Sequence, residues 1–204
     1  EGSSFRDINR LSRICSETDV SFFLKIGGAE AVRDIKDSLE IGVNGLIAPM
    51  IESKFAAKKF IDAYRKIYQD TPVNTSLNIE TKIGIKNIEE IVGFSNGFID
   101  NITIGRSDLT SSFFDKELNP DSDFIFKLIE DVVPIIHEAN MSLTFGGGVT
   151  YKTIEKIKKS FPSLKESVLK IETRKVIFHT SDLIDRDDSI RQALKFEELY
   201  ILSK

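Results

Sequence analysis

Short apolar runs alternate with longer amphipathic stretches along most of this chain of 204 residues. Such alternation is typical of repeated βα units, in which a helix returns the chain to the same end of a parallel sheet. Most of the runs are interpreted as apolar on both faces, as expected for strands covered by helices on one side and packed strands on the other. Six runs have the length of strands: Val20–Ile26, Gly45–Met50, Thr75–Glu80, Asn101–Ile104, Ser142–Phe145 and Val168–Phe178.

The segments between these runs have helical periodicity. One apolar stripe follows the spacing i, i+3, i+4, i+7 from Phe60 to Ile67, and a second runs from Ile125 to Ile136. Pro134 should kink the second helix or remove one of its hydrogen bonds. Ser53 and Thr150 are the expected N-caps of helices that follow strands.

Six βα units are readable, which is one or two short of a closed (β/α)8 barrel. An open six-stranded sheet would leave two unpaired edges, which folds normally avoid. The chain begins at Glu1 without an initiator Met. We therefore expect an α/β fold of the TIM-barrel class, a single domain over 1–204 whose first two strands precede residue 1. A charged C-terminal tail, 182–204, should be helical around Ile190–Leu199. The alternative is a complete open α/β sheet.

Composition excludes several classes of function. The net charge of −4 and the absence of a clustered basic face argue against nucleic acid or an anionic membrane as partner. A single cysteine, Cys15, permits no internal disulfide, and its place on a stripe with Leu11 and Ile14 predicts a small buried side chain. No apolar run approaches the roughly 20 residues of a membrane span, and no signal peptide opens the chain, so we expect a cytoplasmic protein.

Reacting groups in parallel α/β folds lie at the carboxyl ends of strands. Glu80 ends one predicted strand and Asp108 follows the next, so the two carboxylates should share one rim of the barrel. Two hard oxygen ligands suit Mg²⁺ or Mn²⁺, with water and substrate completing the coordination. Asp108 has an alternative role as a helix cap, whereas an acid at the end of an apolar strand, such as Glu80, needs a partner.

Other polar residues have weaker signals. The Gly146–Gly148 turn would suit a phosphate or carboxylate, or would simply be a tight βα turn that requires glycine. His137 and His179 are expected at the surface or in packing. The segment 172–175 is unusually charged for a buried strand, and we expect Arg174 to pair with a neighbouring carboxylate.

Three segments resemble consecutive signatures of the HpcH/HpaI aldolase and citrate lyase β-subunit family: "IGVNGLIAPMIES", "LNIETKIGIKNIEEI" and "ITIGRSDLTSS". The resemblance runs from about Glu1 to His179. It implies a (β/α)8 barrel that binds Mg²⁺ or Mn²⁺ through Glu80 and Asp108. It also implies chemistry at a carbon–carbon bond next to a 2-oxo acid or acyl-thioester, and a homo-oligomer.

The resemblance implies further site residues, with departures. Lys25 occupies the place of a family Arg that stabilises the enolate oxygen, and lysine lacks the bidentate fork of arginine. Asn78 replaces a Gln two residues before the metal-binding Glu80. From their positions alone, and not from the resemblance, Arg106 and Ser107 would offer backbone donors beside the metal, and Gly146 and Gly147 would cradle a phosphate or carboxylate of the substrate. For the family's acid/base residues only Glu1 lies nearby, so the general base is unassigned, with a metal-bound water as the default.

These observations favour a metal-dependent aldolase or lyase that acts through the enolate of a pyruvate-like 2-oxo acid or an acyl-CoA. Lys25, Glu80 and Asp108 are its predicted catalytic residues. The change of Arg to Lys and the missing His leave a second hypothesis open, a barrel that binds a small anion or a protein partner without turnover. A third is a barrel enzyme that binds a phosphorylated substrate at Gly146–Gly148.

Overall fold

The computed structural model describes residues 3–184 and 187–202. It contains one seven-stranded sheet whose strands lie in chain order, with the first six parallel and the last antiparallel to its neighbour. The strands are β1 (Phe23–Lys25), β2 (Gly45–Ala48), β3 (Asn74–Ile79), β4 (Asn101–Gly105), β5 (Ser142–Gly146), β6 (Lys170–Glu172) and β7 (Ile177–His179).

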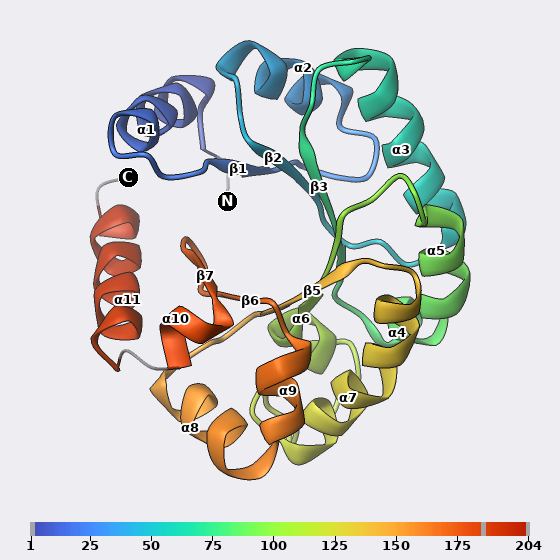
Figure 1. Cartoon of the computed structure of the whole chain (residues 1–204), viewed down its shortest axis with the longest axis vertical. Coiled ribbons are helices and arrows are strands. Elements are labelled where there is room, and N and C mark those ends of the chain that lie inside the picture. The colour runs from blue at the N-terminus through green and yellow to red at the C-terminus, as the bar shows by residue number, and fades with distance from the viewer. Residues whose placement is uncertain (1–2, 185–186, 203–204) are drawn as a thin grey trace.

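The sheet curls into an open half-barrel with helices around its convex side (Figure 1). The predicted α/β class is confirmed, although the described residues form a half-barrel and not a closed ring of eight strands. The helices are α1 (Phe5–Glu17), α2 (Val32–Ile41), α3 (Lys54–Tyr68), α4 (Lys82–Lys86), α5 (Ile88–Ser95), α6 (Arg106–Ser111), α7 (Asp123–Glu138), α8 (Tyr151–Ser160), α9 (Pro162–Ser167), α10 (Thr180–Ile184) and α11 (Asp187–Leu202).

Local sequence explains where several helices begin. The Ser53 hydroxyl accepts a hydrogen bond from the backbone N–H of Ala56 and caps α3, as predicted. Thr150 caps α8 in a reciprocal arrangement with Thr153, which confirms the second predicted cap. Helix α7 is continuous through Pro134. Both capped helices follow strands directly, so the caps fix the loops at the carboxyl ends of β2 and β5.

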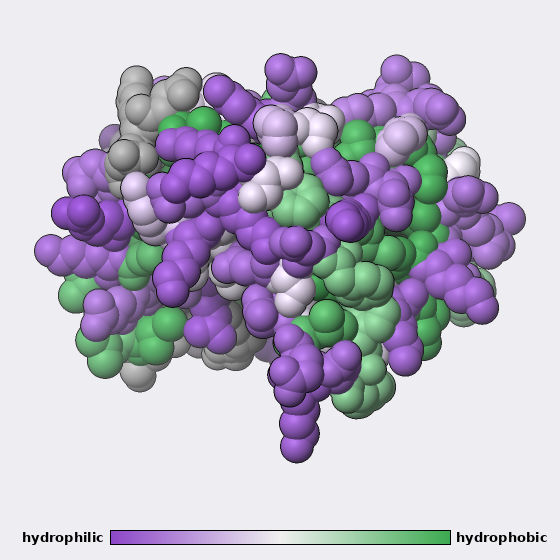
Figure 2. Space-filling model, turned by 90° about the horizontal axis from the view of Figure 1, so that it is seen from below, coloured by the Kyte–Doolittle hydropathy of each residue, from purple (hydrophilic) through white to green (hydrophobic). Residues whose placement is uncertain are grey.

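The main core lies between the convex face of the sheet and the helices. The outward side chains of the central strands are fully buried there: Leu77 and Ile79 of β3, Ile102 and Ile104 of β4, and Leu143 and Phe145 of β5. Apolar stripes of the helices complete this layer, including Phe60 of α3 and Ile129 of α7. On the outer surface, hydrophilic residues predominate over one side of the molecule, with apolar groups between them (Figure 2).

The concave face of the sheet is polar, and the expectation of strands apolar on both faces was wrong for β3, β4 and β5. Asn101 donates from Nδ2 to the hydroxyls of Ser76 and Thr103, at 2.8 and 3.1 Å. Its Oδ1 accepts hydrogen bonds from Thr144 and Ser142. Because these buried hydroxyl and amide groups bond to one another within and between the strands, this part of the face avoids the cost of unpaired polar atoms.

The predicted long strand Val168–Phe178 was also wrong, because this segment is a hairpin of β6 and β7. The backbone N–H of Thr173 donates to the carbonyl of Val176 at 2.8 Å and closes the turn. The charged segment 172–175 therefore belongs mostly to a turn. Arg174 is exposed, and its backbone N–H donates to Glu197 of α11. Strand β7 covers the outer edge of β6, and in the described residues no strand pairs with the free edge of β1.

The two ends of the described chain meet beside the opening of the half-barrel, where α1 and α11 lie near each other (Figure 1). The hydroxyls of Ser3 and Tyr200 are 3.2 Å apart there. Within the described ranges, none of the helices has the length and apolar character needed to cross a membrane.

Candidate functional site

Four residues form one layer at the carboxyl ends of the central strands. The pairings Ile79↔Ile104, Gly105↔Gly146 and Phe145↔Ile171 bring Glu80, Gly105, Gly146 and Glu172 to the same level of adjacent strands. A Cβ added to Gly105 would lie 2.7 Å from Glu80 Oε1, and one added to Gly146 would lie 2.5 Å from Glu172 Oε1. The two glycines thus leave the space into which the two carboxylates lean from either side.

Glu80 is almost completely buried, and three donors satisfy its carboxylate. Lys25 Nζ lies 3.0 Å from Oε1, and Asn78 Nδ2 donates to the same oxygen at 3.1 Å. The backbone N–H of Met50 donates to Oε2 at 3.1 Å. Met50 has a φ of 53°, an unfavourable conformation for a residue with a side chain, at the position where its N–H meets this carboxylate.

The structure therefore brings together three of the predicted site residues, Lys25, Asn78 and Glu80. They come from β1 and the end of β3, which are separated by β2. The curl of the sheet and the length of the lysine side chain allow this ion pair. Asn78 Oδ1 is buried with no hydrogen-bond partner in the described residues, so the group beside Glu80 retains one unused acceptor.

Asp108 lies in the first turn of α6, directly after β4. The predicted alternative of a helix cap is wrong, because Gly105 is the N-cap and no side chain makes the cap hydrogen bond. The Asp108 side chain is exposed, and within the described residues it has no hydrogen-bond or ion-pair partner. Since Glu80 is level with Gly105, the two carboxylates belong to neighbouring strand ends.

Arg106 is fully buried, and its side chain contacts other parts of the protein. Its Nε donates to the carbonyl of Gly146 at 3.2 Å, and its Nη1 donates to Asp121 at 2.8 Å. The guanidinium lies 4.2 Å from the centre of the Phe145 ring. Burial lowers the pKa of Arg106 to about 10, against the opposing effect of Asp121, so the group stays charged at neutral pH. The side chain ties the end of β4 to the turn after β5.

The turn after β5 approaches the start of α6 closely. Gly147 has a φ of 79°, and a Cβ there would lie 2.6 Å from the backbone N of Ser107 and 2.7 Å from that of Arg106. Only glycine fits this conformation and this approach. The tight-turn interpretation of Gly146–Gly148 is thus sufficient to explain Gly147, and binding of an anion there stays a prediction.

Glu172, at the end of β6, is a site residue that the sequence interpretation missed. Burial raises the pKa of Glu172 to about 7, the positive charge of Lys25 lowers it, and the negative charge of Glu80 raises it. These effects place Glu172 in the same electrostatic environment as the pair Lys25–Glu80. A sequence signal did exist, because "Lys170-Ile171-Glu172" repeats the polar–Ile–Glu ending of "Asn78-Ile79-Glu80".

Other titratable residues lie away from this layer. His137 Nε2 is 2.9 Å from the carbonyl of Ser167 at the surface, and His179 is exposed at the end of β7. Glu1 lies outside the described residues. Cys15 is partly buried, not fully as predicted, and desolvation raises its pKa.

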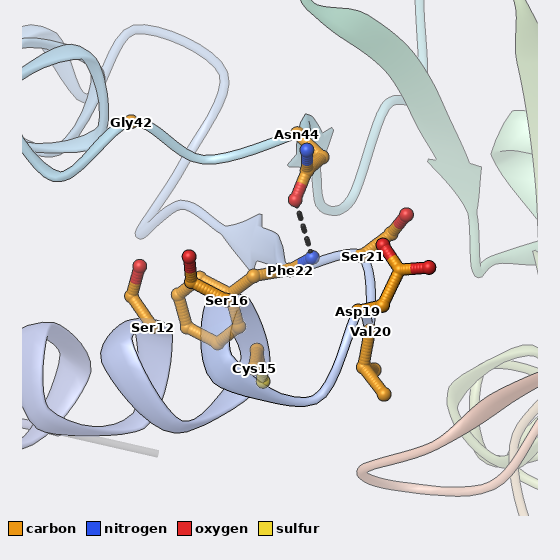
Figure 3. Close-up of a pocket in the computed structure, with 9 residues that line it drawn as sticks. All are labelled: Ser12, Cys15, Ser16, Asp19, Val20, Ser21, Phe22, Gly42 and Asn44. Atoms are coloured by element: carbon orange, nitrogen blue, oxygen red, sulfur yellow. Dashed lines mark hydrogen bonds between the residues drawn. The ribbon is translucent and has the colours of Figure 1, made fainter.

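Cys15 lines a pocket of about 220 Å³ between α1 and the segments that precede β1 and β2 (Figure 3). The hydrogen bond from Phe22 N to Asn44 Oδ1 holds these two segments together. The pocket lies at the amino ends of the strands, opposite the carboxylate layer, so it belongs to a different part of the molecule.

Glu80 and Asp108, at neighbouring strand ends, are oxygen donors of the kind that a hard divalent cation prefers. Glu80 already holds one cation, the Lys25 ammonium, and Asp108 offers unused carboxylate oxygens. In the described part of the chain, no cluster of three or more His, Cys, Asp or Glu side chains is arranged to hold a metal. Two carboxylates alone would leave most coordination positions to water or substrate, as Mg²⁺ sites commonly do.

Comparisons with known proteins agree with this fold. An HpcH/HpaI aldolase from Desulfitobacterium hafniense DCB-2 has a TM-score of 0.67 at 15% identity, covering 84% of this chain and 72% of its own. An HpcH/HpaI aldolase/citrate lyase family protein from Burkholderia cenocepacia J2315 has a TM-score of 0.64 at 17% identity, with coverages of 96% and 81%. A citrate lyase from Burkholderia xenovorans LB400 has a TM-score of 0.64 at 10% identity, with coverages of 97% and 81%.

The sequence comparisons give two results. No curated protein matches the sequence. The family model described as HpcH/HpaI aldolase/citrate lyase matches residues 14–141, which is more than half of the chain and includes Lys25, Glu80 and Asp108. The chain therefore belongs to the HpcH/HpaI aldolase/citrate lyase family.

Proposed function

We propose that this chain is a carbon–carbon lyase or aldolase that acts through the enolate of a pyruvate-like 2-oxo acid or of an acyl-CoA. The family is one of lyases that generally depend on a divalent metal. The observation that carries the proposal is the buried Glu80 carboxylate, paired with Lys25 and one strand away from the unpaired Asp108. Buried charge at a strand end is costly, so its presence there indicates a functional role.

Each residue has a defined part in this proposal. Glu80 and Asp108 would hold Mg²⁺ or Mn²⁺, which would supply a Lewis acid for the 2-oxo group. Lys25 would place its ammonium at the developing enolate oxygen, an interaction typically worth about 2.7–4 kcal/mol. Asn78 has a free acceptor for a substrate hydroxyl or a water molecule.

The substrate's carboxylate would lie beside the start of α6 and the turn after β5. Backbone N–H groups of Arg106 and Ser107, together with Gly146 and Gly147, are the proposed contacts. The Arg106 side chain would act indirectly, because its bonds to Gly146 and Asp121 fix both loops. We further propose that the half-barrel belongs to a (β/α)8 barrel and that the protein is a homo-oligomer.

Deuterium exchange tests the proposal. The chain is incubated with pyruvate and Mg²⁺ or Mn²⁺ in deuterated water, and loss of the methyl protons is followed by NMR. Glu80→Gln and Asp108→Asn should each slow exchange by at least about 100-fold. Glu89→Gln, a change of an exposed glutamate on α5, is the matched control and should leave the rate unchanged.

Exchange that survives both Glu80→Gln and Asp108→Asn would remove this site from the mechanism. Absence of exchange with pyruvate but exchange of the acetyl protons of acetyl-CoA would assign the acyl-thioester branch.

A second candidate is a barrel that binds a small anion or a protein partner without turnover. The ion pair of Lys25 with Glu80 favours it, because the ammonium occupies the oxygen that a metal would need. Measurable Mn²⁺ binding without exchange of either substrate would support this candidate over the lyase.

A further inference from the structure

Glu172 has the position of a reacting group. Its side chain faces the concave side of the sheet and leans over Gly146. It also lines, with Thr144 and Lys170, a hollow of about 130 Å³ that extends from this layer toward the amino ends of the strands. The side chain is half-buried, and within the described residues its carboxyl group has no hydrogen-bond or ion-pair partner. A carboxyl group that is partly withdrawn from water and unpaired lowers stability and holds no other group in place, so it has no evident structural role.

The distance to the rest of the site is short. Neighbouring strands lie about 4.8 Å apart, and the two glycines between the carboxylates are paired. Glu80 and Glu172, which lean toward each other over this pair, thus lie within roughly 10 Å of each other. Glu172, Glu80 and Lys25 therefore face the same small region of the concave side.

The charges around Glu172 come from few elements. Lys25 of β1 and Glu80 after β3 act on it, whereas β4 and β5 present only Gly105 and Gly146 at this level. The residue opposite Glu172 on β7 is Ile177. On β6 itself, Lys170 faces the same side, with its ammonium 5.9 Å from the Phe23 ring centre.

We propose that Glu172 is the general acid–base residue of the site, exchanging a proton with the carbon next to the substrate's carbonyl. This inference rests on the proposed function. As a carboxylate, Glu172 removes a proton from that carbon; the C–H electron pair becomes the enolate double bond, and the carbonyl π pair moves onto oxygen beside Lys25. In the reverse step the protonated Glu172 returns the proton to carbon. Nothing is oxidised or reduced.

The raised pKa of Glu172, about 7, supports this role, because a proton carrier works best when its pKa lies near the working pH. Glu172 would also be the general base that could not be assigned from the sequence. His137 and His179 lie at the surface, and Glu172 is the carboxyl that shares the layer with Glu80.

The test compares Glu172→Gln with the wild type and with Glu166→Gln, which changes an exposed glutamate on α9. Exchange of pyruvate protons is measured from pH 5 to pH 9. The wild-type rate should rise through pH 7 as Glu172 loses its proton. In Glu172→Gln the rate should fall by about 10²–10⁴-fold and lose that rise. Mn²⁺ affinity should stay within about threefold of wild type, and Glu166→Gln should behave as wild type.

Two outcomes would overturn the inference. One is a Glu172→Gln variant that keeps the wild-type rate and pH profile. The other is a variant whose Mn²⁺ affinity falls by more than about tenfold, since Glu172 would then hold the metal and not the proton.

A second readout separates this inference from the proposed function. In metal-free protein with ¹³C-labelled glutamate, the Glu172 carboxyl resonance, assigned by its loss in Glu172→Gln, is titrated by NMR. If the wild type shows no exchange with either substrate, the proposed function fails. The titration then decides by itself whether Glu172 is a proton-carrying carboxyl. Titration near pH 7 supports a proton-carrying carboxyl at this place, and titration in the ordinary range near pH 4.3 overturns it.

Discussion

The two faces of the central strands are almost equally buried but differ in chemistry. On β3 and β4, Leu77, Ile79, Ile102 and Ile104 point to the helices, whereas Ser76, Asn78 and Thr103 point to the concave side with at most 4% exposure. Apolar burial contributes about 25 cal/mol per Å² of surface removed from water, whereas a buried hydrogen bond contributes only about 1 kcal/mol net. The convex face therefore stabilises the fold, and the concave face provides a polar environment at modest net gain.

This difference explains where the charged groups gather. Lys25, Glu80 and Glu172 all project from the concave face at the carboxyl ends of strands, next to the polar network of Asn101. A carboxylate on the convex face would have no donors within reach. Substitutions on the convex face should therefore mainly lower the free energy of unfolding, whereas substitutions on the concave face should mainly change the chemistry of the site.

The largest effect on stability is expected on the convex face. Ile102→Ala removes a fully buried side chain from the main core and should lower the free energy of unfolding by about 2–5 kcal/mol, measured by urea denaturation with circular dichroism. Ile102→Val should cost only about 0.5–1.5 kcal/mol. Proton exchange by the folded fraction should not change. A loss below about 1 kcal/mol for the alanine variant would contradict the assignment of this face as the stabilising one.

The next effect concerns pH and the concave face. Because the pKa of Glu172 is raised to about 7 in the folded state, folding favours its protonated form. Its contribution is fully present below the unfolded pKa, near 4.3, and is lost as the pH rises through about 7. The stability of the wild type relative to Glu172→Gln should therefore fall by a few kcal/mol between pH 4.5 and pH 8. A difference that is constant over this range would contradict a half-buried, unpaired carboxyl with a raised pKa.

The sequence predicts the convex face well and the concave face poorly. Apolar runs located β2, β3, β4 and β5 to within a few residues, because burial against helices selects such residues. The alternation in Thr75–Glu80 was available as a signal for a polar inner face, but the apolar members of the run concealed it. The turn of the β6–β7 hairpin contains no glycine or proline, so nothing interrupted the predicted strand Val168–Phe178.

A site residue could be predicted only where its position directly after a predicted strand was enough to identify it. Glu80 and Asp108 follow from the rule that parallel strands present their reacting groups at the carboxyl end. The ion pair of Lys25 with Glu80 depends on how far the sheet curls across β2, and local periodicity carries no information about that. Glu172 was missed because its strand was extended past its true end.

The smallest effect separates the two faces most directly, because it concerns the residue next to Ile102. Thr103→Val keeps the shape of the side chain but removes a hydroxyl that is 3.1 Å from both Ser76 Oγ and Asn101 Nδ2. Asn101 still donates one amide N–H to Ser76, whereas its second N–H loses the Thr103 acceptor at the wall of the hollow, where water can replace the hydroxyl. We therefore expect a loss of only about 1 kcal/mol in the urea experiment. If Thr103→Val instead cost as much as Ile102→Ala, the polar network would stabilise the sheet as strongly as the core does. The concave face would then have a structural reason for its composition, independent of any chemistry at Glu80 and Glu172.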